Sequence, residues 1–514
     1  MVKRFIFFIS LFGLISFSSY AQTYNGSQTF YNQTALNNFG TNEYTKITGN
    51  LFIDGSLISD LSPLMSLDSI GGKLKIQNNT LITSLAGLDN ISYVGSDLSI
   101  SANSALTSLS GIGNITSING NLTISNNIAL TAMTGLENIT SVDGNLTISY
   151  NSSLTATTGL ENITSVDESL KILNNSSLNS LSGLGNISNL GVLLEIIGNP
   201  ALTSLTGLYN YNSLYGLYIN ENPSLVSISG LSNLSSITHS LFIEKNNILT
   251  SIAPLSSLTD IGVELSIENN QSLTSLAGLE NLISIGGDFG LKYNNALSSL
   301  TGLSGLTSIG SDFYFIGNHG ITTLNGLGNL TNTSNGLFIS SSNLTNLEGL
   351  DNFSSANGLY LESNDELESL TGLESYVSSG VELYIKYNEE LVDYCGVDNL
   401  FQNGNFQGLY NVEQNDYNPT EQELIDGICT PLSLDENNPF DEVIIFSSLQ
   451  SVNFQLGDLK DLNITISDVQ GRVIYRSQNV NSEVYTVDLG KIKGLLLIEI
   501  KNDKYQKTYK FLKE

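Results

Sequence analysis

The clearest hydrophobic pattern in the chain is a six-residue motif, L-x-I-x-x-N, in which apolar and polar positions alternate and an asparagine follows. Residues 122–127, with the sequence LTISNN, are a complete copy. Two apolar residues separated by one position point to the same side of a β-strand, so each copy predicts a short strand. The motif occurs fifteen times at spacings of 22 to 24 residues, with copies starting at Leu51, Leu74, Leu98, Leu122, Leu146, Leu170, Leu194, Leu217, Leu241, Leu265, Phe289, Phe313, Leu337, Leu359 and Leu383.

A fixed period of this length is the signature of a solenoid, in which each coil covers the apolar face of the next. After the asparagine come segments such as LTSLAGL (273–279) and NITSV (138–142), so each coil has three apolar sides and three polar corners. We therefore predict a mainly β protein: a right-handed parallel β-solenoid of about fifteen coils. At about 4.8 Å per coil, this stack is roughly 70 Å long.

Two corner residues are predicted to shape each coil. The asparagine of the motif, replaced only by Ser56 and Ser342, suits a turn and can bond its counterparts in a ladder. A glycine marks the second corner, where it permits positive φ or close backbone approach. Pro63, Pro254 and Cys395 stand at this corner in three copies.

The first 21 residues have the pattern of a secretory signal peptide. Lys3 and Arg4 precede an apolar run at 5–17 and a small-residue site at 19–21, which predicts cleavage between Ala21 and Gln22. The alternative is a membrane anchor, but the run is too short to span a bilayer comfortably. No later stretch has the pattern of a transmembrane helix, so we expect none in the mature chain.

The solenoid repeats cover residues 51–394, and a cap is predicted at each end of them. Residues 22–50 form the first, with a short amphipathic helix over 34–39 that ends at Gly40. Residues 395–430 form the second, in which Thr420 and Glu423 have the spacing of a capping box. Cys395 and Cys429, the two cysteines of the chain, flank this cap, and in an exported protein they predict a disulfide. In the chain-entropy model it contributes about 3–4 kcal/mol.

The repeat stops before the C-terminal segment. After a linker at 431–436, residues 437–514 contain alternating apolar and polar runs at 462–468, 484–489 and 495–500. These runs predict a small antiparallel β-sandwich.

Charge limits the partners of the solenoid. The net charge is −30, and residues 22–434 hold seven lysines, no arginine and 37 acidic residues. We expect such a surface to bind neither nucleic acid nor anionic lipid.

Little in the sequence indicates catalysis. His239 and His319 lie far apart, near corners, and no His or Cys cluster has metal-ligand spacing. Acidic pairs such as Asp365 and Glu366 could in principle hydrolyse a glycoside, but a solvated acidic face is the better explanation for them. We therefore predict a protein without catalytic residues, metal or cofactor. A carbohydrate-active enzyme on a β-solenoid and a purely structural surface rod are the alternatives.

The middle residue of L-x-I points outward, and its chemistry changes along the chain. It is mostly Ser, Thr or Lys in early coils and aromatic in later ones. A flat aromatic stripe rimmed by polar residues could bind a glycan or a protein ligand, although aromatics also favour strands and stack on each other. The candidate ligand-binding residues are Tyr218, Phe242, Tyr314, Phe338, Tyr360 and Tyr384, with Tyr293 and Tyr387 at nearby outward or corner positions.

Over about residues 30–430, these coils resemble the leucine-rich-repeat and receptor L-domain group, the latter being a ligand-binding ectodomain module. The motif residues given above carry this resemblance. It implies recognition or adhesion at a cell surface. A parallel β-helix without kinship to that group has a similar fold and remains the alternative.

The C-terminal segment resembles the sorting domain of the type IX secretion system of Bacteroidetes. Leu496 stands where that family usually has tyrosine. The resemblance implies export across both membranes by the secretion machinery, then attachment to the cell surface or release. The residues that carry it are Asn438, Pro439 and Phe440, then Asp468, Gly471 and Arg472, the strand that starts at Gly494, and the basic run at 507–513.

Overall fold

The computed structural model describes residues 22–377, 382–402, 404, 406–431, 440, 443–447, 450–457, 459–502 and 506–513. The chain divides into two compact units, Met1–Thr430 and Pro431–Glu514. The predicted cleavage residue Ala21, the linker residues 432–436, and Asn438 and Pro439 lie outside the described residues.

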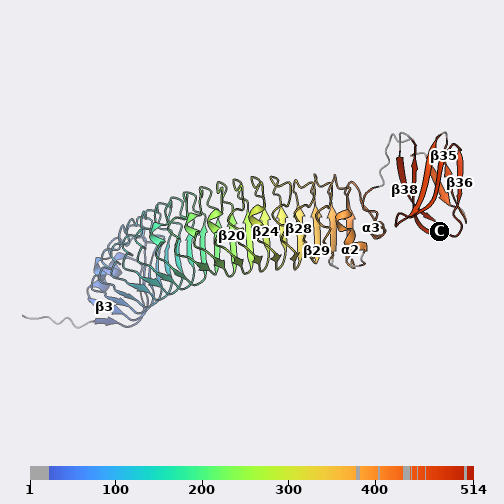
Figure 1. The fold of residues 1–514 in the computed structure, drawn as a ribbon. Coiled ribbons are helices and arrows are strands. Elements are labelled where there is room, and N and C mark those ends of the chain that lie inside the picture. The colour runs from blue at the N-terminus through green and yellow to red at the C-terminus, as the bar shows by residue number, and fades with distance from the viewer. Residues whose placement is uncertain are drawn as a thin grey trace, which may run out of the picture. The chain divides into compact units, whose positions relative to one another are not determined.

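The first unit is the predicted parallel β-solenoid, and one long sheet runs along it (Figure 1). Its strands pair in chain order and in register, so that Leu122 lies beside Leu146 and Ile124 beside Ile148. The long sheet consists of β2 (Gln28–Phe30), β4 (Leu51–Asp54), β6 (Leu74–Gln77), β8 (Leu98–Ser101), β10 (Leu122–Ser125), β12 (Leu146–Ser149), β14 (Leu170–Leu173), β16 (Leu193–Ile197), β18 (Gly216–Asn220), β20 (Ser240–Glu244), β22 (Glu264–Glu268), β24 (Phe289–Lys292), β26 (Phe313–Ile316), β28 (Gly336–Ser340), β29 (Gly358–Glu362), β30 (Glu382–Lys386) and β31 (Leu409–Glu413).

The long sheet extends beyond the fifteen copies of the motif at both ends. In the N-terminal cap, β2 pairs with β4, and in the C-terminal cap, β31 pairs with β30. Neither strand has the sequence L-x-I, because Gln28 and Phe30 stand at the two apolar positions of the motif in β2, and Tyr410 and Val412 stand there in β31. The caps therefore continue the backbone ladder as well as covering the ends of the core.

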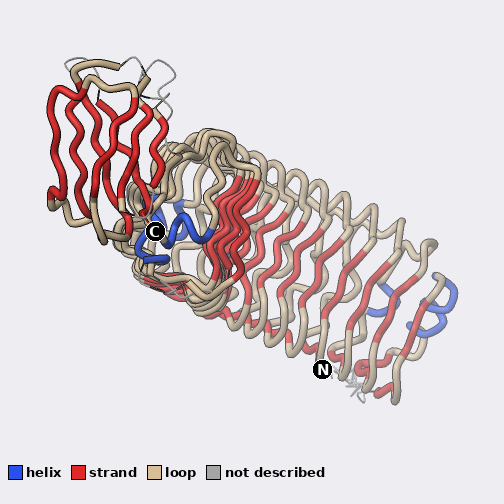
Figure 2. The backbone as a smooth tube through the Cα atoms, turned by 90° about the vertical axis from the view of Figure 1, so that its right-hand side faces the viewer, coloured by secondary structure: helices blue, strands red, loops and turns tan. Residues whose placement is uncertain are grey.

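The long sheet forms one side of each coil. In most coils a second side is a two-residue strand, and the third side consists of turns and 3-10 helices (Figure 2). The short strands form three parallel sheets: β1 (Gln22–Tyr24), β3 (Tyr44–Ile47), β5 (Ser69–Ile70) and β7 (Tyr93–Val94); β9 (Ser117–Ile118), β11 (Ser141–Val142), β13 (Ser165–Val166) and β15 (Asn189–Leu190); and β17 (Ser213–Leu214), β19 (Ser236–Ile237), β21 (Asp260–Ile261), β23 (Ser284–Ile285), β25 (Ser308–Ile309) and β27 (Asn332–Thr333). The 3-10 helices are η1 (Ser62–Leu64), η2 (Ser182–Leu184), η3 (Ser229–Leu231), η4 (Ala253–Leu255), η5 (Thr301–Leu303) and η6 (Cys395–Val397).

The α-helices lie in the caps. Helix α1 (Gln33–Gly40) confirms the predicted amphipathic helix, and the Asn32 side chain caps it by accepting from the Ala35 N–H at 2.9 Å. Helix α2 (Asp398–Gln402) follows η6, and α3 (Glu421–Ile425) begins with the predicted capping box of Thr420 and Glu423. Among the described residues, no helix has the length and apolar character needed to cross a lipid bilayer.

Leucine and isoleucine side chains from all three sides fill one continuous core, and a buried asparagine ladder runs beside them. The Asn151 Oδ1 accepts from the Asn127 N–H at 3.0 Å, while its Nδ2 donates to the Ile124 carbonyl at 2.9 Å. Each amide thus bonds the backbone of the preceding coil. The ladder consists of Asn79, Asn103, Asn127, Asn151, Asn175, Asn199, Asn222, Asn246, Asn270, Asn294, Asn318, Asn364, Asn388 and Asn415.

Two corners of the coil need unusual backbone geometry. The residue before the ladder asparagine is left-handed, with φ of 55° at Asn126. At the glycine corner, Gly111 has φ of 114°, and a Cβ there would lie 2.0 Å from the Leu85 carbonyl oxygen. This corner therefore needs glycine for both conformation and space.

A second row of asparagines, at the surface, also ties coil to coil. The Asn114 Nδ2, for example, donates to the Asp89 carbonyl at 2.6 Å. These amides were not expected from the sequence to join neighbouring coils. The row consists of Asn90, Asn114, Asn138, Asn162, Asn186, Asn210, Asn233, Asn281, Asn329, Asn352 and Asn399.

The second unit is the predicted small antiparallel β-sandwich. Val452 and Phe454 from one sheet share a buried core with Ile464 and Ile498 from the other. The three-stranded sheet consists of β32 (Ile444–Ser447), β33 (Ser451–Gln455) and β36 (Val484–Asp488), and the four-stranded sheet of β35 (Val473–Val480), β34 (Leu462–Asp468), β37 (Gly494–Lys501) and β38 (Gln506–Lys513).

Replacing one amide of the buried ladder tests its contribution to the fold. Asn151→Ala leaves the Asn127 N–H and the Ile124 carbonyl buried without their partner, which costs about 1–3 kcal/mol. We expect a clearly lower urea midpoint, measured by circular dichroism. Asn138→Ala, in the surface row, is the matched control because water replaces its amide. Equal midpoints for the two variants would contradict the assignment.

Candidate functional site

The parallel register brings the predicted aromatic residues of the long sheet into one outward-facing row. Tyr218 lies beside Phe242, and four further rings follow one another from coil to coil. Between the two groups the row continues through Ser266 and Gly290. We call the six residues Tyr218, Phe242, Tyr314, Phe338, Tyr360 and Tyr384 the aromatic ladder.

The rings of the aromatic ladder stack mainly on one another. The centroids of Tyr218 and Phe242 lie 4.6 Å apart at an interplanar angle of 11°, and those of Phe338 and Tyr360 lie 4.2 Å apart at 3°. Neighbouring rings therefore cover much of each other's faces, which leaves mainly the ring edges exposed. Of the two arrangements considered from the sequence, mutual stacking is the one found, so the row is not a flat platform of open ring faces.

Lysine side chains lie over the ends of the four-ring group. The Lys292 Nζ is 5.0 Å from the centroid of Tyr314 and 2.7 Å from a Glu268 oxygen. At the other end, the Lys386 Nζ is 4.8 Å from the centroid of Tyr384. These cation–π contacts stabilise the end rings.

Tyr293 and Tyr387 are not part of the aromatic ladder. Both occupy the left-handed corner before the buried asparagine, each with φ of 57°. A Cβ added to Gly317 would lie 2.5 Å from the Tyr293 Cδ1, so this ring covers the next corner along the solenoid. Both tyrosines keep nearly half of their surface exposed at the edge of the long sheet.

Glycines lie beneath two of the rings and were not singled out from the sequence. A Cβ on Gly336 would be 2.4 Å from the Phe338 ring, and one on Gly358 would be 2.5 Å from the Tyr360 ring. The rings lie back over the position two residues earlier in their own strand, which only glycine leaves free. The signal was present as G-L-F and G-L-Y, with a third copy at 216–218.

Carboxylates bind the hydroxyl groups of the aromatic ladder. The Tyr314 hydroxyl donates to Asp312 at 3.1 Å, and the Tyr360 hydroxyl donates to Glu382 at 3.1 Å. Asp312 is nearly buried and also accepts from the Gly336 N–H at 2.7 Å. Asp312, which precedes the first inward-facing residue of its strand, thus ties the Tyr314 ring to the backbone of the following coil.

These surroundings change the acidity of several groups. Burial, followed by the Asp312 carboxylate, raises the pKa of Tyr314 to about 12. Burial is also the main cause of the raised pKa of Tyr360, with Glu382 adding to it. The pKa of Glu264 is raised by burial and by the nearby charge of Asp288.

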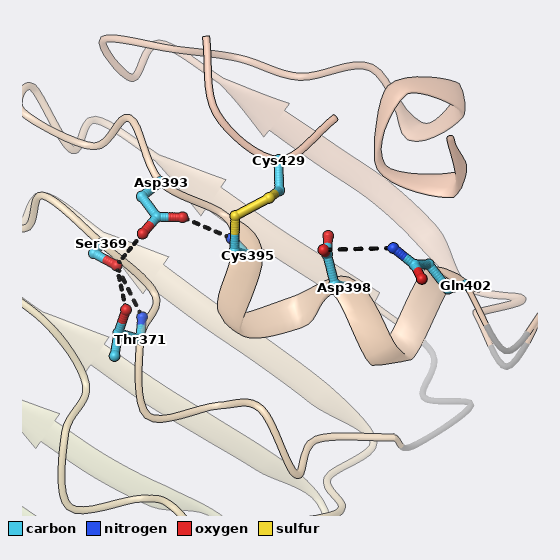
Figure 3. Close-up of a disulfide and its surroundings, with 7 residues drawn as sticks. All are labelled: Ser369, Thr371, Asp393, Cys395, Asp398, Gln402 and Cys429. Atoms are coloured by element: carbon cyan, nitrogen blue, oxygen red, sulfur yellow. Dashed lines mark hydrogen bonds between the residues drawn. A yellow bond between two sulfur atoms is a disulfide. The ribbon is translucent and has the colours of Figure 1, made fainter. Parts of the chain in front are cut away.

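The predicted disulfide between Cys395 and Cys429 is confirmed, with the two Cα atoms 4.9 Å apart (Figure 3). Asp393 lies beside it and accepts from the Cys395 N–H at 2.9 Å. Among the described residues, these three form the only cluster with metal-ligand spacing, and both sulfur atoms are used by the disulfide.

The two histidines make local contacts at corners. The His239 Nδ1 lies 2.8 Å from the Ser240 hydroxyl, and the His319 Nδ1 lies 3.2 Å from the Asn343 Oδ1.

The described residues that carry the resemblance to a sorting domain have structural roles in the sandwich. Asp468 accepts from the Arg472 N–H at 2.9 Å and its Nε at 2.6 Å, and these bonds lower the pKa of Asp468. Gly471 supplies a positive φ of 78° in this turn, and Gly494 starts β37 with φ of 106°. Phe440 is fully buried in the sandwich core.

Two further residues of the predicted export signals, Gln22 and Lys513, have defined places in the structure. Gln22, the first residue after the predicted cleavage point, begins β1. The last lysine of the basic run, Lys513, is buried and donates to the Ile492 carbonyl at 3.0 Å. A hollow of about 670 Å³ lies beside the Asp468–Arg472 turn and is lined partly by Val469, Val473 and Leu495.

No protein-family model matches the chain, and no curated protein sequence matches it either. The resemblances to the receptor L-domain group and to the sorting domain therefore stay predictions.

The environment of Tyr314 gives a pH-dependent prediction. Because its folded pKa lies above the ordinary value of 10, its contribution to stability is fully present below pH 10 and is lost as the pH rises toward about 12. In a titration of 13C-labelled tyrosine, we expect one resonance that ionises near pH 12 and is absent from Tyr314→Phe. If the resonance missing from that variant ionises near pH 10, the buried hydrogen bond to Asp312 is contradicted.

Proposed function

We propose that this protein is an exported recognition or adhesion protein whose aromatic ladder and flanking carboxylates form the binding surface. The observation that carries the proposal is the contrast between two halves of one sheet. Strands β8 to β12 stack in the same register as β26 to β30, yet Ser99, Thr123 and Thr147 occupy their outward row. Because the fold forms without rings at this position, the rings support a role beyond folding.

The geometry favours a protein ligand over a glycan. A sugar ring stacks on an open aromatic face, and most of the faces here are covered by neighbouring rings or by lysine. Ring edges, tyrosine hydroxyls and carboxylates are what this surface offers, and tyrosine and phenylalanine are enriched at protein interfaces. A glycan ligand remains an outcome of the binding experiment.

Export is part of the same proposal. The disulfide is compatible with an oxidising compartment, and the N-terminal pattern and the resemblance of residues 437–514 to a sorting domain support secretion. We propose the type IX secretion machinery as the partner of the C-terminal sandwich and the cell surface or extracellular space as the destination.

The binding surface is tested with the variant Tyr314→Ser/Phe338→Ser/Tyr360→Ser in the chain from Gln22 to Glu514. We expect saturable binding in a screen of host-surface proteins and glycans, weakened at least about tenfold in this variant. The control is Tyr93→Ser/Tyr150→Ser/Tyr209→Ser, which removes three exposed rings outside the aromatic ladder. Circular dichroism checks that both variants keep the solenoid.

Three results of that screen would be decisive. Binding lost only in the aromatic-ladder variant supports the proposal, and equal affinity in both variants contradicts it. If no ligand binds and no product forms from any glycan, a passive surface rod becomes the better account.

The export proposal is tested by deleting residues 437–514 in a bacterium with a type IX secretion system. We expect the truncated chain to stay in the periplasm, where cell fractionation and surface proteolysis detect it. The full-length chain, expressed in parallel, is the control. Truncated protein at the cell surface in the same amount would contradict the role of this segment.

A further inference from the structure

Acidic residues accumulate on the same part of the long sheet as the aromatic ladder. Three rows of side chains face outward there: the residue before the inward leucine, the residue between the inward pair, and the residue after it. In strands β16 to β31 these rows hold two lysines, Lys292 and Lys386. The carboxylates in the same rows are Glu195, Glu244, Glu264, Glu268, Asp288, Asp312, Glu362, Glu382 and Glu413.

In the earlier half of the sheet, the outward rows hold more lysines than acidic residues. In strands β4 to β14 the same rows hold Asp54 and Asp97, against Lys73, Lys75 and Lys171. The acidic excess therefore begins in the coils where the rings begin, and it is not a uniform property of the solenoid. We call the outward rows of β16 to β31 the acidic aromatic face.

Most carboxylates of this face form no ion pair with the lysines and arginines that the structure describes. Lys292 pairs with Glu268 and Lys386 with Glu413, while Lys171 from the preceding coil pairs with Glu195. Among the described residues, the remaining six form no ion pair. Several accept hydrogen bonds from neutral groups instead, as Glu244 does from the Ser266 hydroxyl at 2.8 Å and the Asn220 amide at 3.4 Å.

We infer that the acidic aromatic face binds a basic protein surface, rich in arginine and lysine. This inference rests on the proposed function and specifies its ligand. The register fixes rows of carboxylates beside rows of rings, and an arginine side chain can bond a carboxylate and contact an aromatic ring together. The chain displays this arrangement itself, because the Lys292 ammonium lies between Glu268 and the Tyr314 ring.

Charge complementarity also decides against other macromolecules. Nucleic acid and acidic glycans carry negative charge and would be repelled. An amino-sugar polymer carries ammonium groups, but its rings would find few open aromatic faces. That polymer is therefore an alternative that the experiment must separate from a basic peptide.

The test uses the chain from Gln22 to Glu514 and three probes: a ten-residue arginine peptide, a ten-residue glutamine peptide and a glucosamine hexamer. We expect the arginine peptide to bind, the other two to bind at least about tenfold more weakly, and high salt to weaken the binding. The variant Glu244→Gln/Glu264→Gln should lose at least about fivefold in affinity for the arginine peptide. Its matched control is Glu389→Gln/Glu390→Gln, which removes the same charge from exposed acids outside the face.

Each outcome supports or overturns the inference. Loss in the face variant with little change in the control supports it. Equal loss in both variants shows general attraction to the acidic rod and overturns it, as does tighter binding of the glucosamine hexamer. If the aromatic-ladder variant loses a ligand that is neutral and insensitive to salt, the proposed function stands and this inference fails.

Discussion

The structure depends on hydrogen bonds that each buried asparagine makes to the backbone of the preceding coil. A buried amide needs partners for both its oxygen and its two N–H groups, and here the neighbouring coil supplies several of them. A slip of one residue would place these amides in the leucine core and turn the leucines outward, so the ladder fixes the register. Ser342 interrupts the ladder once, and its hydroxyl donates to Asn364 at 2.6 Å.

Because the register is fixed, residues at the same position of successive repeats form a continuous row on the surface. Because equivalent residues lie one coil apart, a run of aromatic residues at one position of the repeat becomes a row of stacked rings. Acidic residues at the neighbouring positions become parallel rows in the same way. The core is nearly the same in early and late coils, whereas the outward rows change from small and hydroxylated to aromatic and acidic. The chemistry of the outward surface can therefore vary along the solenoid without changing the fold.

Periodicity was enough to predict the solenoid, the inward leucines and the buried asparagines, because each is a repeated backbone requirement. The disulfide was predictable because Cys395 and Cys429 are the two cysteines of a chain whose N-terminal pattern predicts export. The direction of the rings was not, since it depends on glycines such as Gly336 and Gly358 beneath them. The surface asparagine row was also missed, because a residue typical of turns gives no sign that its amide reaches the coil before. The absence of rings at Ser266 and Gly290 could be read from the sequence. The positions of the Glu268 and Lys292 side chains could not, and a Cβ added to Gly290 would meet them at 3.2 and 3.5 Å.

The most direct test of this account is disulfide cross-linking between Ser266 and Gly290, the two positions at which the outward row has no ring. Ser266 and Gly290 are register partners in adjacent strands, so Ser266→Cys/Gly290→Cys should form a disulfide readily under mild oxidation. Ser266→Cys/Tyr314→Cys places the thiols two coils apart, about 10 Å, and should not cross-link within one molecule. Mass spectrometry of the unreduced digest distinguishes the two results. Efficient cross-linking of the second pair, or none of the first, would contradict the register on which the acidic aromatic face depends.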